Sequence, residues 1–345
     1  MGADKRILVL LTGGTICSTE NANGERYSDV GNVRIVEAFR HGDSPNAKTA
    51  DFDIIAPLDV LSENMTPDTW NRLLDCFRSQ VDWERYCGII VLHGTDTLAY
   101  TASMLSIALA GAPIPICLVS AQLPLACKDT NGHANFGASV DLILGGVAPN
   151  VYAVYRNMNG TMYIHYGAHL RQCESYSNDF YSADAMEMTD ALSASPACRP
   201  FETDARLYEQ DFSFSSCVLT LTPYVGMDYA GLSLQGVRAI VHQTYHSESV
   251  CVERSRGEGA YSSASLLWLA DRCKALRIPL FLSPCSSQSY RYESTGDALR
   301  GGAIALYGMT EEMAYAKLLL GCALGYDEKK LVSFVQQSIN HEFIY

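Results

Sequence analysis

Short runs of apolar residues alternate with longer amphipathic stretches along most of this chain. The apolar runs predict strands at Ile7–Leu11, Gly88–Leu92, Pro115–Val119, Val151–Tyr155, Val218–Leu221, Val237–His242, Pro279–Ser283 and Ala303–Tyr307. Several of these runs are apolar throughout, which is typical of parallel strands that are buried on both faces.

The stretches between these strands have helical periodicity. One helix is expected from Thr66-Pro67 to about Gln80, because threonine is a good N-cap and proline suits the first helical position. Further helices are expected at roughly Thr97–Ala110, His133–Leu144, Ser262–Leu276 and Thr310–Leu324. Strands that alternate with helices predict an α/β fold with mostly parallel sheets.

A polar segment at residues 186–213 interrupts this alternation. It contains Ser193-Ala194-Ser195-Pro196 and Arg199-Pro200. Polar segments with prolines commonly join domains. We therefore expect a larger N-terminal α/β domain over residues 1–185, a linker over 186–213 and a smaller C-terminal α/β domain over 214–345.

The composition indicates a packed and acidic globular protein. Of the 345 residues, 48% are hydrophobic and 18% are charged, and 38 acidic residues against 25 basic ones give a net charge of −13. An acidic chain without a basic stripe disfavours nucleic acid as a partner. The first apolar run, Ile7–Leu11, is too short for a signal peptide, and no run reaches membrane-spanning length, so we expect a cytoplasmic protein.

No metal site and no cofactor are expected. None of the 12 cysteines belongs to a Cys-x-x-Cys motif, and neither His165/His169 nor His242/His246 belongs to a His-Glu-x-x-His motif. Phosphate-binding glycine motifs are also missing from the sequence. We expect the cysteines to be reduced thiols.

Two segments that follow predicted strands are the candidates for chemistry. Thr12-Gly13-Gly14-Thr15 follows Ile7–Leu11, and its glycines allow a tight backbone path close to a ligand, although an ordinary turn is the alternative. His93-Gly94-Thr95-Asp96-Thr97 follows Gly88–Leu92 and opens a helix, although an ordinary helix cap is the alternative. Together they place hydroxyls and a carboxylate at strand ends, which suits amide hydrolysis.

These two segments, with Ile16 after the first, resemble the paired signature of bacterial-type L-asparaginases and their glutaminase-asparaginase relatives. The resemblance continues along the whole chain, and its cytoplasmic (type I) branch is indicated by Ser62-Glu63. Further similar segments are Met65-Thr66-Pro67-Asp68, Ser120-Ala121-Gln122, Asn131–Asn135 and Met309–Leu318.

The resemblance implies a cofactor-free hydrolase of L-asparagine, with L-glutamine as the alternative substrate, that works as a homodimer or homotetramer. It implies that Thr15 is the nucleophile and that Tyr27, on a loop that closes over the substrate, orients it. Thr95 would be the second catalytic threonine. Asp96 would hold the substrate α-amino group and support the proton relay.

The resemblance also implies the substrate-binding residues. Ser62 would hold the α-carboxylate and Glu63 would face the α-amino group, since a carboxylate attracts an ammonium. Gly14, Gly94 and Ala121 would line the rest of the site.

One residue departs from the pattern of this family. The resemblance calls for a lysine in the catalytic relay, and aligning residues 163–172 on that segment puts Arg171 in its place. Arginine stays protonated and cannot act as a base. Slow catalysis, another substrate, or a protein that binds a ligand without hydrolysing it are therefore open alternatives. An amidotransferase subunit of the same fold is a further one.

Overall fold

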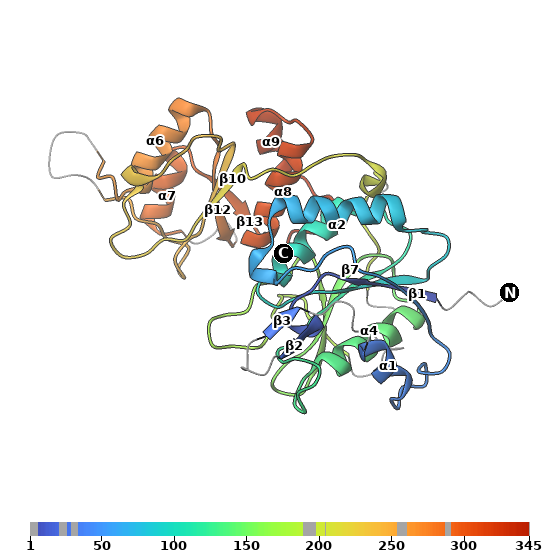
Figure 1. Ribbon diagram of the computed structural model, residues 1–345. Helices are drawn as coiled ribbons and strands as arrows, with labels where there is room; N and C mark the ends of the chain where they lie inside the picture. Colours follow the sequence, from blue (N-terminus) through green and yellow to red (C-terminus); the bar gives the residue numbers. More distant parts are fainter. Residues whose placement is uncertain are drawn as a thin grey trace. The chain divides into compact units, whose positions relative to one another are not determined.

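The structure, a computed structural model, describes residues 6–20, 26–28, 34–188, 198–203, 205–253, 261–286 and 291–344. The chain divides into two compact units. Unit 1 comprises Met1–Asp211 with Ile339–His341, and unit 2 comprises Phe212–Ser338 with Glu342–Tyr345. The expected α/β fold with mostly parallel sheets is confirmed (Figure 1). The segment expected as a linker belongs to unit 1 as far as Asp211.

Unit 1 is built on a seven-stranded sheet in the order β4-β1-β5-β6-β7-β8-β9. The first five strands in that order are parallel, and β8 and β9 continue the sheet antiparallel. The bounds of these strands are β1 Arg6–Leu11, β4 Asp51–Ile55, β5 Gly88–Leu92, β6 Ile116–Val119, β7 Val151–Arg156, β8 Met162–Tyr166 and β9 Met186–Glu187. The sequence pattern did not predict β4, because this edge strand contains two aspartates and is only partly buried.

Helices cover both faces of this sheet. Figure 1 shows α1 and α4 together on one face and α2 on the other. Their bounds, with the remaining short elements of the unit, are α1 Arg34–Arg40, α2 Pro67–Gln80, α3 Leu98–Ala108, α4 Gly132–Leu144, the 3-10 turns η1 Thr15–Cys17, η2 Ser62–Asn64 and η4 Leu207–Glu209, and the paired strands β2 Ser18–Glu20 and β3 Arg26–Ser28.

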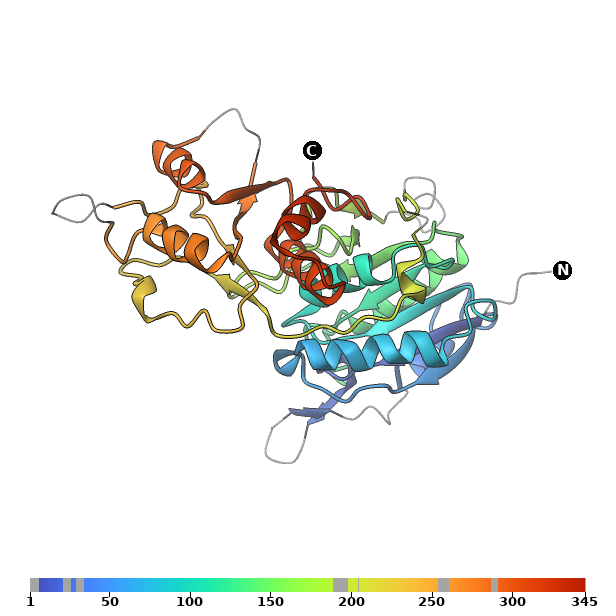
Figure 2. The ribbon, with the colours of Figure 1, turned by 90° about the horizontal axis from the view of Figure 1, so that it is seen from above.

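Unit 2 has a four-stranded parallel sheet in the order β10-β11-β12-β13. Within this unit, α8 and α9 lie side by side, as Figure 2 shows. Its elements are β10 Val218–Leu221, η5 Tyr229–Gly231, β11 Ala239–His242, α6 Leu266–Leu276, β12 Leu280–Cys285, α7 Glu293–Arg300, β13 Ile304–Tyr307, α8 Glu311–Ala323 and α9 Glu328–Val335. The amino group of Lys317 is fully buried in this unit and pairs with the carboxylate of Glu342.

His93 follows β5 and is fully buried in unit 1. Its Nδ1 lies 2.7 Å from the carbonyl oxygen of Gly94. A carbonyl oxygen only accepts hydrogen bonds, so Nδ1 carries a proton. The ring is then neutral as long as Nε2 is unprotonated. Burial lowers the pKa of His93 to about 4, although the Gly94 carbonyl and the charge of Asp96 act in the opposite direction.

The N-cap of α2 gives a first test. Thr66 Oγ1 accepts a hydrogen bond from the backbone N–H of Thr69 at 3.2 Å, and Pro67 occupies the first helical position, as the sequence predicted. Thr66→Ala removes this acceptor, so we expect the free energy of unfolding to fall by about 1 kcal/mol. Thr66→Ser keeps the acceptor and is the control. Urea unfolding that gives equal stabilities for the two variants would contradict this role.

His93 gives a second test, in which stability depends on pH. The unfolded ring has its ordinary pKa of 6.5, so the folded state resists protonation and stability is lost as the pH falls from 6.5 towards 4. We expect His93 alone to contribute a loss of roughly 3 kcal/mol across that window. His93→Asn retains an N–H donor for Gly94 and cannot take up the proton, so its urea-unfolding free energy should fall less.

Burial also lowers the pKa values of His165 and His242. These two residues therefore contribute to acid unfolding of the wild type and of His93→Asn alike. The informative quantity is therefore the difference between wild type and His93→Asn at each pH. A difference that stays constant from pH 7 to pH 4 would rule out this contribution of His93.

Candidate active site

The loops that follow β1 and β5 leave the sheet at its topological switch point. From β1 the chain crosses to β4 on one side, and from β4 it passes to β5 on the other side of β1. Leu11 pairs with Leu92, so both loops start at the same level, and Thr12 Oγ1 donates to the Leu92 carbonyl at 2.7 Å. Open α/β sheets bind ligands at such points. The fold thus puts both candidate segments where a ligand site is expected.

Glycine backbones bring the two loops into direct contact. A Cβ atom on Gly14 would lie 2.4 Å from the Cα of Gly94, so no side chain fits between them. Gly14 also has a φ of +78°, a left-handed conformation that favours glycine. Thr15 directly follows Gly14, and Thr95 directly follows Gly94. The backbones of the two threonines therefore begin at this contact.

Ser62 joins this pair of loops from the turn η2. Its hydroxyl accepts from the backbone N–H of Asp96 at 3.2 Å and donates to Asp96 Oδ2 at 3.3 Å. Thr97 Oγ1 donates to the Ser62 carbonyl at 2.8 Å. A Cβ atom on Gly94 would lie 2.4 Å from Ser62 Oγ. The structure therefore brings the predicted site residues Ser62, Gly94 and Asp96 together. Glu63, in the same turn as Ser62, is exposed.

Thr95 and Asp96 line a cavity of about 340 Å³ in unit 1. Gln122 reaches it from the loop after β6, and Tyr155 from the end of β7. The predicted Ala121 is fully buried beside Gln122. The rest of the lining comes from the segment after β8, namely Gln172, Cys173, Glu174, Ser175, Ser177 and Asn178.

Gln172 is the residue of that segment that holds the Thr95 loop. Its Nε2 donates to the Thr95 carbonyl at 2.8 Å, and its Oε1 accepts from the Ala99 backbone N–H at 3.4 Å. The sequence pattern did not single out this residue. Its amide cannot act as a base, but it ties the backbone of Thr95 to that of Ala99 in α3.

Arg171, which was expected in the catalytic relay, is not among the residues that line this cavity. Its backbone N–H donates to Tyr181 at 3.0 Å in a short antiparallel bridge, and its side chain is exposed. Successive side chains of an extended segment point to opposite sides, so only one of Arg171 and Gln172 faces the cavity. An alignment moved by one residue would have pointed to Gln172.

Two predicted catalytic residues have side chains outside the described part of the chain. They are Thr15 and Tyr27. The backbone of Thr15 begins the turn η1, immediately after the contact of Gly14 with Gly94. The backbone of Tyr27 lies in β3, where it pairs with Thr19 of β2.

The ionisable groups of the cavity wall respond to burial. Burial is the main reason why the pKa of the Cys173 thiol rises to about 12, with smaller effects of the charges of Asp179 and Asp96. Burial also raises the pKa of the Tyr155 hydroxyl to about 12. Both groups therefore stay protonated near neutral pH.

Neither metal nor membrane features were found in the part of the chain that the structure describes. No group of three or more His, Cys, Asp or Glu side chains there is arranged to hold a metal ion. Among the same residues, no helix is long and apolar enough to cross a membrane.

Comparison with known proteins identifies relatives of the whole chain. The family model "Asparaginase, N-terminal" matches residues 6–194. The L-asparaginase of Thermococcus kodakarensis is 24% identical over 345 residues, with 98% of each chain covered. A subunit of the glutamyl-tRNA(Gln) amidotransferase of Methanosphaera stadtmanae is 25% identical over 329 residues, which cover 91% of this chain and 71% of the relative.

A solved structure gives the same result for the fold. L-asparaginase I from Vibrio cholerae superposes with a TM-score of 0.73 at 22% identity, covering 99% of this chain and 100% of that one. The family model spans more than half of the chain, and the predicted family, fold class and class of enzyme, an amidohydrolase, are confirmed. The protein belongs to the asparaginase family.

Proposed function

We propose that this protein hydrolyses the side-chain amide of L-asparagine to L-aspartate and ammonia, with the Thr15 hydroxyl as nucleophile. The proposal depends above all on the backbone contact of Gly14 with Gly94, because Thr15 and Thr95 follow these glycines directly. The L-asparaginase from Thermococcus kodakarensis, which aligns over nearly the whole chain, supports the choice of substrate.

In this mechanism Thr15 Oγ attacks the carboxamide carbon, and Tyr27 orients it. The proton of Thr15 passes by way of Thr95 and the carboxylate of Asp96 to the amide nitrogen. The C–N bond then breaks and ammonia leaves an ester on Thr15. Water attacks this ester, releases L-aspartate and restores the hydroxyl. Backbone N–H groups of the two loops stabilise the oxyanion that forms in each step.

Substrate binding uses the charges of the amino acid. Ser62 donates to the α-carboxylate, while the carboxylates of Asp96 and Glu63 attract the α-ammonium group. Gly14 and Gly94 have no side chains and would let the substrate approach the backbone closely. Ala121, the third small residue that the resemblance implies, is fully buried beside Gln122.

The cavity suits a small polar substrate. Its volume of about 340 Å³ lies at the small end of the range of roughly 300–1,000 Å³ for ligand pockets. Asparagine and glutamine differ by one methylene group, which is worth only about 1–3 kcal/mol in discrimination. L-glutamine is therefore the second substrate to test.

A cysteine nucleophile is the main chemical competitor, because Cys173 lines the same cavity. The thiolate is the nucleophilic form of cysteine, and burial raises the pKa of Cys173 to about 12. The thiol therefore stays protonated near neutral pH, which favours a threonine alcohol as the attacking group.

Gln172 favours a second candidate function, a protein that binds the amino acid and turns it over slowly or not at all. The resemblance implies a lysine in the relay, whereas the side chain on the Thr95 carbonyl is an amide without charge. An amide does not take up a proton near neutral pH. Calorimetry with L-aspartate would detect such binding, and ammonia release measured on the same sample would separate the two functions.

An amidotransferase role is supported by relatives such as the amidotransferase subunit of Methanosphaera stadtmanae. In that case ammonia release would depend on a partner protein. For the leading proposal we expect a cytoplasmic homodimer or homotetramer without cofactor, active on its own.

The nucleophile is tested by Thr15→Ala and Thr95→Val. Each variant loses a hydroxyl that the mechanism needs, so ammonia release from L-asparagine should fall at least a hundredfold. Thr49→Ala, at an exposed threonine outside these loops, is the control and should keep the wild-type rate. Wild-type rates of hydrolysis in both Thr15→Ala and Thr95→Val would contradict this mechanism.

The relay is tested by comparing Gln172→Lys with Arg171→Lys. A lysine at position 172 can still donate to the Thr95 carbonyl, and its amine can transfer a proton. We expect kcat for L-asparagine to rise by about tenfold in Gln172→Lys. Arg171→Lys changes an exposed side chain and should leave kcat unchanged. If Arg171→Lys raises kcat and Gln172→Lys does not, Arg171 takes part in the relay and Gln172 does not.

A further inference from the structure

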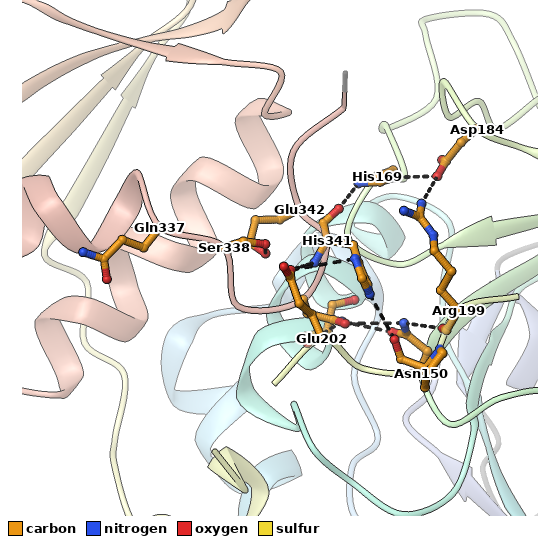
Figure 3. Close-up of polar contacts among 12 residues, drawn as sticks. Asn150, His169, Asp184, Arg199, Glu202, Gln337, Ser338, His341 and Glu342 are labelled. Carbon is orange, nitrogen blue, oxygen red and sulfur yellow. Dashed lines mark hydrogen bonds and ion pairs between the residues drawn. The ribbon is translucent and has the colours of Figure 1, made fainter. Parts of the chain in front are cut away.

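His169 lies at the start of the segment that carries Gln172, and it is almost fully buried, with 2% of its surface exposed. Its Nδ1 lies 2.8 Å from Asp184 Oδ2, and its Nε2 contacts the backbone carbonyl oxygen of His341. Figure 3 shows the ring between these two oxygens. All of these residues belong to unit 1.

The two contacts define the charge of the ring. A backbone carbonyl only accepts hydrogen bonds, so Nε2 of His169 must carry a proton. An ionised Asp184 also only accepts, so Nδ1 must carry one too. Burial raises the pKa of Asp184, but the hydrogen bond and charge of His169, with Arg199 3.6 Å away, outweigh burial and lower it. The ring is therefore an imidazolium beside a carboxylate.

The acceptor on the other side of the ring is held firmly. The His341 backbone N–H donates to Glu202 at 2.8 Å, and its ring Nε2 lies 3.1 Å from the Pro200 carbonyl. Its φ of +55° is unusual for a residue with a side chain and persists only where neighbours fix it. Asn340 is buried and donates to Ser106 at 3.0 Å. The carbonyl of His341 is thus a fixed point.

The short segment from His169 to Gln172 connects this fixed point to the cavity. Leu170 is fully buried, and the Arg171 N–H is bound to Tyr181 at 3.0 Å. Gln172 then holds the Thr95 carbonyl. A shift of the His169 ring would therefore be transmitted over three residues to Thr95.

We propose that the His169 imidazolium is a positioning residue that locks the Gln172 segment, and through it Thr95, against the C-terminal residues of unit 1. Loss of one ring proton leaves a single donor, so the ring must release either Asp184 or the His341 carbonyl. This inference rests on the proposed role of Thr95.

The surroundings contain a few other charged or titratable groups. Arg199 and Asp184 face the ring from one side, and Glu202 with the imidazole of His341 lie beyond the carbonyl. The ring of Tyr166 lies edge-on, with its centroid 6.1 Å away.

His165 is another buried histidine near Asp184, on the neighbouring strand β8. Its Nδ1 lies 2.9 Å from Ser182 Oγ, and burial lowers its pKa to about 4. It is therefore neutral near neutral pH and does not provide a second charged histidine beside Asp184.

The first experiment measures the charge of the ring in the full-length protein. Nitrogen-15 NMR of the histidine rings, assigned with His169→Gln, should show both ring nitrogens of His169 protonated at neutral pH. A neutral tautomer at neutral pH would overturn the inference. This measurement does not depend on enzyme activity.

The second experiment measures the kinetics of ammonia release. His169→Gln cannot donate to both acceptors, so it should lower kcat by roughly tenfold with little change in KM. Asp184→Asn removes the carboxylate that accepts from Nδ1 and should lower kcat in the same way. His41→Gln, at an exposed histidine, is the control. An unchanged kcat in folded His169→Gln and Asp184→Asn would overturn the inference.

The two proposals fail in different ways. Wild-type protein that releases no ammonia from any amide refutes the proposed function, and the NMR measurement still decides the state of His169. An active wild type whose kcat is unchanged in folded Asp184→Asn and His169→Gln refutes only the role of His169.

Discussion

The backbone contact between Gly14 and Gly94 is the constraint on which the rest of the site depends. Parallel pairing of β1 with β5 brings the ends of these strands to one level, but strands alone leave room for side chains between their loops. Glycines at both positions let the loops touch, and Gly94 also touches the hydroxyl of Ser62. One close approach thereby gathers a hydroxyl, a carboxylate and two threonine backbones at the switch point of the sheet.

Around this contact the protein uses neutral and charged groups in different places. The side chain that holds the Thr95 carbonyl is the neutral amide of Gln172, whereas His169, three residues earlier, lies 2.8 Å from the half-buried carboxylate of Asp184. A neutral amide fixes geometry without changing the charge of the cavity. The contacts of the His169 ring lie outside the cavity, so they can hold the same segment without adding a charge beside the substrate.

Most of the fold and part of the site could be predicted from the sequence. Strands such as Gly88–Leu92 were predicted because buried parallel strands are apolar throughout, and the loops were located by their glycines. β4 was missed because its alternating polar pattern is weak, and Gln172 was missed because one residue of register in an extended segment exchanges its two faces. The return of Ile339–His341 to unit 1 was not predictable, since its contacts join residues far apart in the chain.

In the proposed site, the hydroxyls of Thr15 and Thr95 face one cavity beside the carboxylate of Asp96. A crystal structure of the protein soaked with L-aspartate, the proposed product, is the most direct test of this arrangement. We expect the side-chain carboxylate of the ligand within hydrogen-bond distance of both hydroxyls, and its α-ammonium group against Asp96. A Thr15 hydroxyl packed away from Thr95, or aspartate bound elsewhere, would contradict it.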